Sequence, residues 1–113
     1  MHEASLALRM VEILEEQARA QHFERVRRVF VEIGRLSHVE PEALRFGFEA
    51  ASLGTIAEGA ELTIEEPPGR AHCMDCEGDV EVEALGEPCP ACGSHRWLLT
   101  AGDEMKVREL EVV

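Results

Sequence analysis

The sequence predicts an α+β fold in which two helices pack against a three-stranded mixed sheet, with a small module inserted before the last strand. Apolar residues recur at helical spacing in two segments and alternate with polar residues in three others. All four cysteines lie between positions 70 and 99, where large apolar residues are few. We therefore expect one α/β domain, residues 1–69 plus 100–113, and an inserted metal-binding module, residues 70–99.

The first two elements are predicted to be a helix over residues 4–20 and a strand over residues 26–34. The large apolar residues of the helix share one face, while its glutamates occupy the others. That face carries Leu6, Met10, Ile13 and Leu14. In the strand, β-branched residues alternate with polar or aromatic ones, and Gly34 is expected to end it.

A second helix is predicted to begin at Pro41, because the fixed φ of proline suits the first helical position. Acidic residues at positions 40 and 42 lie where the helix dipole favours negative charge. The stripe of this helix that we expect to be buried contains Leu44, Phe48 and Ala51. Gly54 is the expected C-terminal stop.

Two further strands are predicted, over residues 61–66 and 104–112. The first alternates apolar and polar residues and is broken by a Pro-Pro-Gly sequence. In the second, the apolar residues change phase between Val107 and Leu110. We interpret that change as a bulge or as burial on both faces. Because a short strand is unstable without a partner, the last strand is expected to return to the first sheet.

The net charge of −12, from 23 acidic and 11 basic residues, disfavours some classes of partner. A nucleic-acid-binding surface needs basic residues to replace counterions of the phosphate backbone, so nucleic acid is not an expected partner. No membrane association is expected either, since no apolar run is long enough to span a bilayer. A cation or a basic protein surface fits this charge. The first residues lack the basic and apolar regions of a signal peptide, so we expect a cytoplasmic protein.

The cysteines form the pattern C-x2-C-x12-C-x2-C. They are Cys73, Cys76, Cys89 and Cys92. Two residues between paired thiolates let each pair hold a metal from a tight turn, and two such turns complete a tetrahedral site. In a cytoplasmic protein, close cysteine pairs hold metal more often than they form disulfides. Four thiolates favour structural Zn²⁺, because a closed shell leaves no open position for catalysis. Iron in a rubredoxin-like site is the alternative, and a redox dithiol is disfavoured because two matched pairs indicate one shared metal.

Neighbours of the cysteines raise two further questions. Gly93 supplies the flexible backbone that the second turn requires, whereas Glu77 stands at the equivalent place in the first turn and predicts a looser turn. His72 and His95 flank the two pairs, and either could exchange into the metal site as an imidazole ligand. We favour solvated loop histidines, since four cysteines already satisfy the metal.

The chain start offers a second set of metal ligands. The α-amine of Met1 and the backbone and imidazole nitrogens of His2 can form fused chelate rings around one metal. The backbone nitrogen of Glu3 could complete a plane of four nitrogens. Ni(II) and Cu(II) prefer a square-planar geometry and accept such a set, whereas zinc would not readily do so.

Together these features resemble the HypA/HybF family of nickel-insertion accessory factors for [NiFe]-hydrogenase maturation. The resemblance rests on the order and spacing of several motifs along essentially the whole chain. They are Met1-His2-Glu3, Val31-Glu-Ile-Gly34, Glu42-Ala-Leu-Arg-Phe46, Gly54-Thr-Ile-Ala-Glu-Gly-Ala-Glu61 and the double C-x2-C module.

The resemblance implies a nickel-binding α/β domain and a zinc-ribbon-like module. Met1, His2 and Glu3 would hold Ni²⁺ as cargo, and the four cysteines would hold Zn²⁺ as a structural ion. The implied partners are a HypB-type GTPase and the [NiFe]-hydrogenase large subunit, and some members of the family also serve urease. A homodimer formed by domain swapping is conceivable, because the inserted module lengthens the path to the last strand.

Two other functions compete with nickel delivery. An enzyme is not expected, because the chain has no nucleophile–base pair, no G-x-x-x-x-G-K-[ST] phosphate loop and no metal site with an open position. A zinc-ribbon module that binds protein without delivering nickel is the main alternative.

Overall fold

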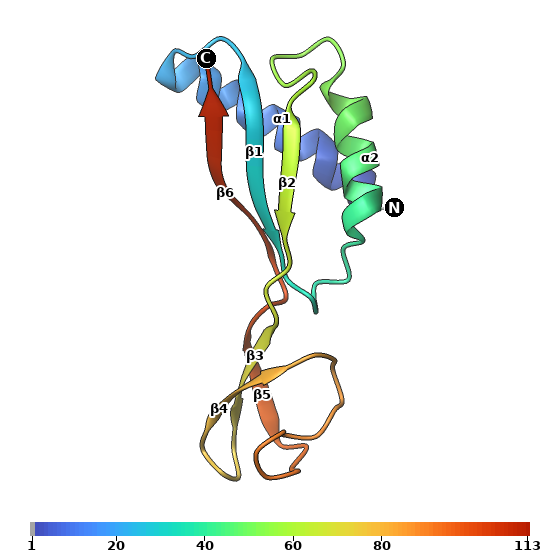
Figure 1. Ribbon diagram of the computed structural model, residues 1–113, viewed down its shortest axis with the longest axis vertical. Helices are drawn as coiled ribbons and strands as arrows, with labels where there is room; N and C mark the ends of the chain where they lie inside the picture. Colours follow the sequence, from blue (N-terminus) through green and yellow to red (C-terminus); the bar gives the residue numbers. More distant parts are fainter. Residues whose placement is uncertain (1) are drawn as a thin grey trace. The chain divides into compact units, whose positions relative to one another are not determined.

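A computed structural model describes residues 2–113, with only the backbone of His2 (Figure 1). Met1 and the imidazole of His2, both predicted nickel ligands, lie outside the described residues. The elements are α1 (His2–Gln21), β1 (Val26–Ile33), α2 (Pro41–Ser52), β2 (Glu61–Glu65), β3 (Gly69–Cys73), β4 (Asp79–Val82), β5 (Trp97–Ala101) and β6 (Met105–Val112).

The predicted α+β fold with two helices and a three-stranded mixed sheet is confirmed. The strands of this sheet have the order β2-β1-β6. β1 and β2 run in the same direction, while β6 runs opposite to both (Figure 1). The last strand therefore returns to the first sheet, as its need for a pairing partner predicted.

The helices and β1 supply the core of this part of the chain. The side chains of Val29, Val31 and Ile33 are almost fully buried, as their alternation predicted. On α2, Leu44 and Phe48 are buried, but the predicted Ala51 is only half-buried. Ser52 takes the buried position instead, and its hydroxyl group donates a hydrogen bond to the Glu49 carbonyl oxygen at 3.1 Å. That bond satisfies the buried hydroxyl, which makes burial of a serine tolerable.

β6 differs from its prediction. Burial on both faces is wrong, because β6 is an edge strand and most of its side chains are exposed. Val107 and Val112, which the two-face interpretation would bury, are 38% and 41% exposed. Only Met105 and Leu110 are half-buried. The other interpretation, a bulge in this strand, stays a prediction.

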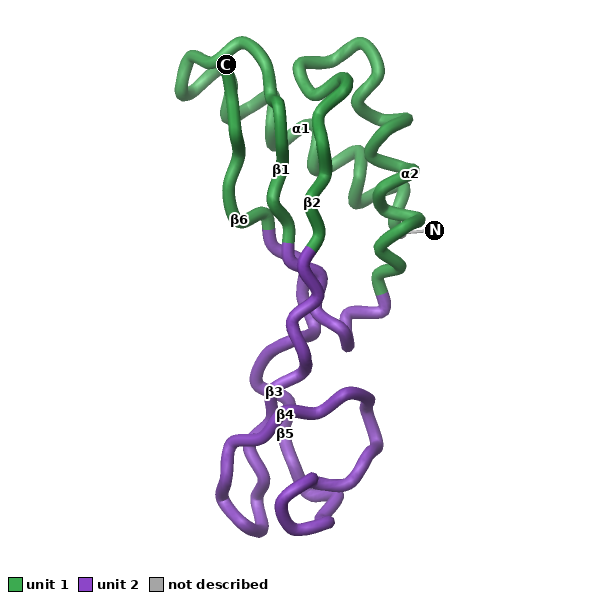
Figure 2. The backbone as a smooth tube through the Cα atoms, viewed as in Figure 1, with its two compact units in different colours: residues 1–31, 39–64, 107–113 green, residues 32–38, 65–106 purple. Residues whose placement is uncertain are grey.

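The described residues divide into two compact units (Figure 2). One contains the residues up to Val31 together with 39–64 and 107–113, and the other contains 32–38 and 65–106. The sequence-based boundaries at 70 and 99 remain a prediction.

The second unit holds a sheet that sequence periodicity did not predict. Its order is β4-β3-β5, and the central β3 pairs antiparallel with both neighbours. Leu36, Ala71 and Val82 form a small buried core, against which the partly buried Val80, Trp97 and Leu99 pack. The second unit therefore has an apolar core, but a much smaller one than the first unit, which contains the two helices.

Two glycines permit a close backbone approach in this unit. A Cβ atom at Gly34 would lie 2.1 Å from the Gly102 carbonyl oxygen. Gly102 itself has a φ of 98°, and a Cβ there would lie 2.5 Å from the Gly69 Cα atom. Any side chain at either position would force these segments apart.

Candidate metal sites

The two C-x2-C pairs sit on two turns with matching hydrogen bonds. In the first turn, the Cys73 backbone N–H donates to the Gly78 carbonyl oxygen at 2.9 Å. In the second, the Cys89 backbone N–H donates to the Ser94 carbonyl oxygen at 2.7 Å. Each bond spans five residues, so both cysteine pairs are presented by the same kind of turn.

Each turn contains a residue in the left-handed backbone region directly after its second cysteine. Gly93 has a φ of 80° there, and Glu77 has a φ of 59°. Glu77 adopts the conformation that glycine would, and the first turn keeps its closing hydrogen bond. The second turn has one further bond, from the Gly93 backbone N–H to the Cys89 carbonyl oxygen at 2.8 Å, so the looser first turn stays a prediction. A left-handed conformation costs a non-glycine residue about 1 kcal/mol, so the first turn carries local strain.

The four cysteine sulfur atoms form one cluster. The Sγ atoms of Cys73, Cys76, Cys89 and Cys92 all lie within 4.8 Å of one another. The Cys73–Cys92 and Cys76–Cys89 Sγ distances are 3.6 Å and 3.9 Å, and all four cysteines are free. Cys73 and Cys89 are buried, whereas Cys76 and Cys92 are exposed.

These spacings fit a tetrahedral metal site. A metal about 2.3 Å from each of four sulfurs would place the sulfurs about 3.8 Å apart, which lies between the two observed distances. The structure therefore supports the predicted four-cysteine metal-binding cluster, and its donor set fits zinc.

The acidities of the thiols show why the cluster favours a cation. The backbone N–H of Cys76 hydrogen-bonds the Cys73 sulfur and lowers the pKa of Cys73 to about 6. The Gly78 backbone N–H favours the Cys76 thiolate, but desolvation and the neighbouring thiol groups outweigh it and raise the pKa of Cys76. The Ser94 backbone N–H acts likewise on Cys92, whose pKa is raised to about 12 by the Cys73 thiol and by desolvation. Four clustered thiols therefore ionise together only when a cation compensates their charge.

A polar bridge joins the two turns. The Asp75 carboxylate, in the first turn, accepts a hydrogen bond from the Arg96 guanidinium at 2.7 Å. It also accepts one from the Ser94 hydroxyl group, whose oxygen accepts the Arg96 backbone N–H at 2.9 Å. Sequence reasoning did not identify this bridge, which connects residues 21 positions apart. In the sequence, only the opposite charges of the residues at positions 75 and 96 could have indicated this bridge.

Neither flanking histidine belongs to the cluster within the described part of the chain. Nδ1 of His72 lies 3.0 Å from an Asp79 carboxylate oxygen, and the two residues are paired across β3 and β4. Because successive strand residues point to opposite faces, His72 and Cys73 project to opposite sides of β3. His95 is exposed.

α1 begins at His2. Of the three predicted nickel-site residues, Glu3 is the one whose backbone and side chain both belong to the described part of the chain. Its carboxylate accepts a hydrogen bond from the Glu40 backbone N–H at 3.0 Å, which lowers the pKa of Glu3 to about 2. Glu40 is the N-cap of α2, and its own carboxylate accepts the Glu42 backbone N–H. Glu3 thereby ties the first turn of α1 to the start of α2, a role that the sequence did not predict.

Comparison with known proteins identifies the family to which this chain belongs. The profile of the family described as hydrogenase/urease nickel incorporation, metallochaperone, HypA matches residues 1–112. This chain belongs to the HypA family. The family is one of maturation factors, so its role is metal incorporation and not catalysis. The family resemblance predicted from the motifs is confirmed.

Relatives and solved structures agree with this assignment. Hydrogenase maturation factor HypA of Azotobacter chroococcum mcd 1 is 54% identical over 112 residues, or 99% of each chain. The HypA protein of Rhodopseudomonas palustris strain TIE-1 is 53% identical with the same coverage. The solution structure of the Ni metallochaperone HypA from Helicobacter pylori matches with a TM-score of 0.72 and 28% identity, covering 100% of this chain and 98% of that one. None of the described helices combines the length and the apolar character of a membrane-spanning segment.

Proposed function

We propose that this member of the HypA family is a cytoplasmic nickel metallochaperone. It binds one Ni(II) ion at its chain start and delivers the ion to the [NiFe]-hydrogenase large subunit, together with a HypB-type GTPase. The observation that carries the proposal is the extent of the family match, which runs from residue 1 to residue 112. The match thus includes both the chain start and the four-cysteine cluster.

The proposed nickel ligands are nitrogens of the first three residues. They are the α-amine of Met1, the backbone and imidazole nitrogens of His2, and the backbone nitrogen of Glu3 as the fourth donor. The carboxylate of Glu3 is not needed as a ligand, because it accepts the Glu40 backbone N–H. That bond supports the proposal by holding the first turn of α1 in one place, which prearranges the backbone donors.

Delivery follows from the character of this site. A chain terminus can exchange ligands with an incoming protein without unfolding any element. The net charge of −12 attracts the cation and favours a partner with a basic surface. The chain lacks a phosphate-binding loop, so nucleotide hydrolysis in this process would belong to the GTPase.

Zinc at Cys73, Cys76, Cys89 and Cys92 has a structural role in this proposal. The sulfur spacing supports it, since 3.6 Å and 3.9 Å are the separations expected around one tetrahedral ion. Zinc bound by four thiolates has no open position, so we assign it no part in nickel transfer.

The test is a nickel titration of the untagged protein, followed by calorimetry and absorption spectroscopy. Native protein should bind one equivalent and give a yellow, diamagnetic, square-planar complex. His2→Ala, and a variant with one residue added before Met1, should each lose tight nickel binding and keep their zinc. His22→Ala is the matched control, because His22 is an exposed loop histidine outside the proposed site. Normal nickel binding by both altered chain starts would refute the terminal site and leave a zinc module that only binds protein.

A further inference from the structure

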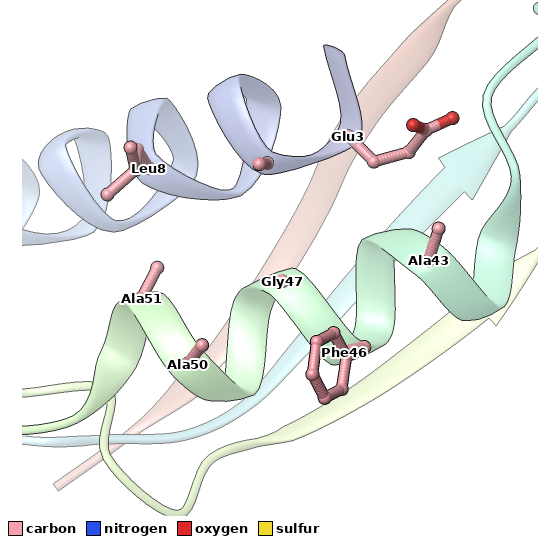
Figure 3. Close-up of a pocket in the computed structure, with 8 residues that line it drawn as sticks. Glu3, Leu8, Ala43, Phe46, Gly47, Ala50 and Ala51 are labelled. Carbon is pink, nitrogen blue, oxygen red and sulfur yellow. The ribbon is translucent and has the colours of Figure 1, made fainter. Parts of the chain in front are cut away.

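The two helices form a groove on the surface of their unit (Figure 3). The groove has a volume of about 520 Å³, and residues of both α1 and α2 line it. All but one of the lining residues are apolar or glycine, and the exception is Glu3. Figure 3 shows Leu8 on α1 and Ala51 on α2 projecting into the space between the helices. The groove is therefore an apolar surface that ends at the first turn of the chain.

α2 has a second apolar face in addition to the one in the core. Leu44 and Phe48 are buried, whereas Ala43, Phe46 and Ala50 recur at helical spacing along the groove. Phe46 is 73% exposed, and Leu8 on the facing helix is 59% exposed. Burial in the fold does not explain such large exposed apolar side chains, which are typical of surfaces that another molecule covers.

The floor of the groove is set by a close helix approach. Gly47 lies where α2 meets α1, and a Cβ atom there would stand 3.3 Å from the Ala7 Cβ. A large side chain at position 47 would therefore separate the two helices. Small residues between the larger Leu8 and Phe46 leave a channel of the kind into which the side chains of a third helix pack.

We propose that this groove binds an amphipathic helix of a partner protein, which inserts apolar side chains between α1 and α2 and carries Lys or Arg beside them. Charge complementarity supports this occupant. Glu49 lies one turn after Phe46 on the exposed surface of α2, and the groove lining contains no basic residue. Glu42 lies one turn before Phe46 and is paired with Arg45 at 3.5 Å. A second copy of this chain fits poorly, because each copy carries a net charge of −12.

The groove ends beside the proposed nickel site. Because Glu3 lines one end, a helix in the groove would contact the first turn of α1. This step rests on the proposed function, in which nickel leaves from that turn. Docking would therefore bring the partner beside the cargo.

The test uses a fluorescein-labelled peptide of 18 residues, with leucines at helical spacing and lysines at the other positions. Its binding to the untagged, zinc-loaded protein is measured by fluorescence anisotropy. Phe46→Ala should weaken binding at least tenfold, and Ala50→Arg should do the same by filling the groove and repelling the lysines. Leu98→Ala is the matched control, because Leu98 is 61% exposed but lies on β5, outside the groove. A peptide with glutamate in place of lysine should bind at least tenfold more weakly.

Several outcomes would overturn the proposal. Equal binding to Phe46→Ala, Ala50→Arg and Leu98→Ala would show that the peptide binds elsewhere, and equal binding of the glutamate peptide would remove the basic partner. Sedimentation that reveals a dimer of the native chain, lost in Phe46→Ala, would identify a second copy as the occupant. Thermal melting checks that both groove variants fold. Nickel titration without peptide separates the two proposals, since groove variants should bind nickel normally whether or not docking is correct.

Discussion

At the residue scale, the residue directly after the second cysteine is left-handed in both cysteine turns, but its type differs between them. Gly93 adopts a φ of 80° as glycine readily does, while Glu77 adopts a φ of 59° against the preference of its Cβ atom. No atom lies within 4 Å of a Cβ built on Gly93, so backbone conformation alone would oppose a side chain there. Substitutions at Glu77 and Gly93 would therefore measure how much free energy of folding a left-handed non-glycine residue costs next to a metal ligand.

Exchanging the residue types at these positions should shift stability in opposite directions. Glu77→Gly should raise the stability of the zinc-loaded module by up to about 1 kcal/mol, because relief of strain outweighs the extra flexibility of the unfolded chain. Gly93→Ala should lower it by about 1 kcal/mol for the converse reason. Thermal melting and competition for zinc with a chelator would measure both. A stabilising effect of Gly93→Ala would contradict the strain argument.

At the scale of elements, the elements that could be predicted were the long ones, and the short β2, in which Leu62 and Ile64 alternate with polar residues. α1, β1 and α2 contain 20, 8 and 12 residues, enough to display a period of 3.6 or 2. β3 and β5 contain five residues each, without large apolar residues in alternation, and β4 contains four. Their core also draws on Leu36, which is remote in sequence from the strands it packs against.

The candidate metal cluster followed from spacing, but its surroundings did not. Two residues between paired cysteines fix the chemistry locally, so the ligand set is visible in the sequence. The bridge from Asp75 to Ser94 and Arg96 exists only once the two turns face each other. The contact between Glu3 and Glu40 likewise joins two elements 37 residues apart, with no pattern in the sequence between them.

The contact between Glu3 and Glu40 predicts that the stability of the packed helices α1 and α2 depends on pH. The pKa of Glu3 is lowered from 4.5 to about 2 by the Glu40 backbone N–H, so the folded state favours the carboxylate. Its contribution to stability is present above pH 4.5 and is lost as the pH falls from 4.5 through about 2. Glu3→Gln should therefore melt at a lower temperature than native protein at pH 6, and the difference should shrink towards pH 2.

Two measurements make this pH test specific. Glu12→Gln, which removes an exposed carboxylate paired with Arg9, should show a smaller and less pH-dependent difference. Nickel stoichiometry should not change in Glu3→Gln, because the backbone nitrogen at position 3 is retained. A melting difference that stayed constant from pH 6 to pH 2 would show that the Glu3 carboxylate does not act through its charge.

At the scale of the whole molecule, the two units depend on different sources of stability. The helical unit buries large side chains, including Met10, Leu14 and Phe48. In the unit with the cysteine cluster, the hydrophobic core cluster consists of the smaller set Leu36, Ala71 and Val82. So small a core cannot offset the conformational entropy of its long loops, which makes metal binding part of the folding energy of this unit.

Removal of zinc should therefore unfold one unit and spare the other. After treatment with a strong chelator, amide protons of β3–β5 should lose their protection against hydrogen exchange, while those around Val29 and Leu44 should keep it. The chain start should still bind one equivalent of nickel, since its ligands belong to the spared unit. Cys92→Ser should reproduce the same pattern without a chelator. Protection that persisted in β3–β5 would show that the small apolar core suffices, and its loss around Val29 as well would show that the units fold only together.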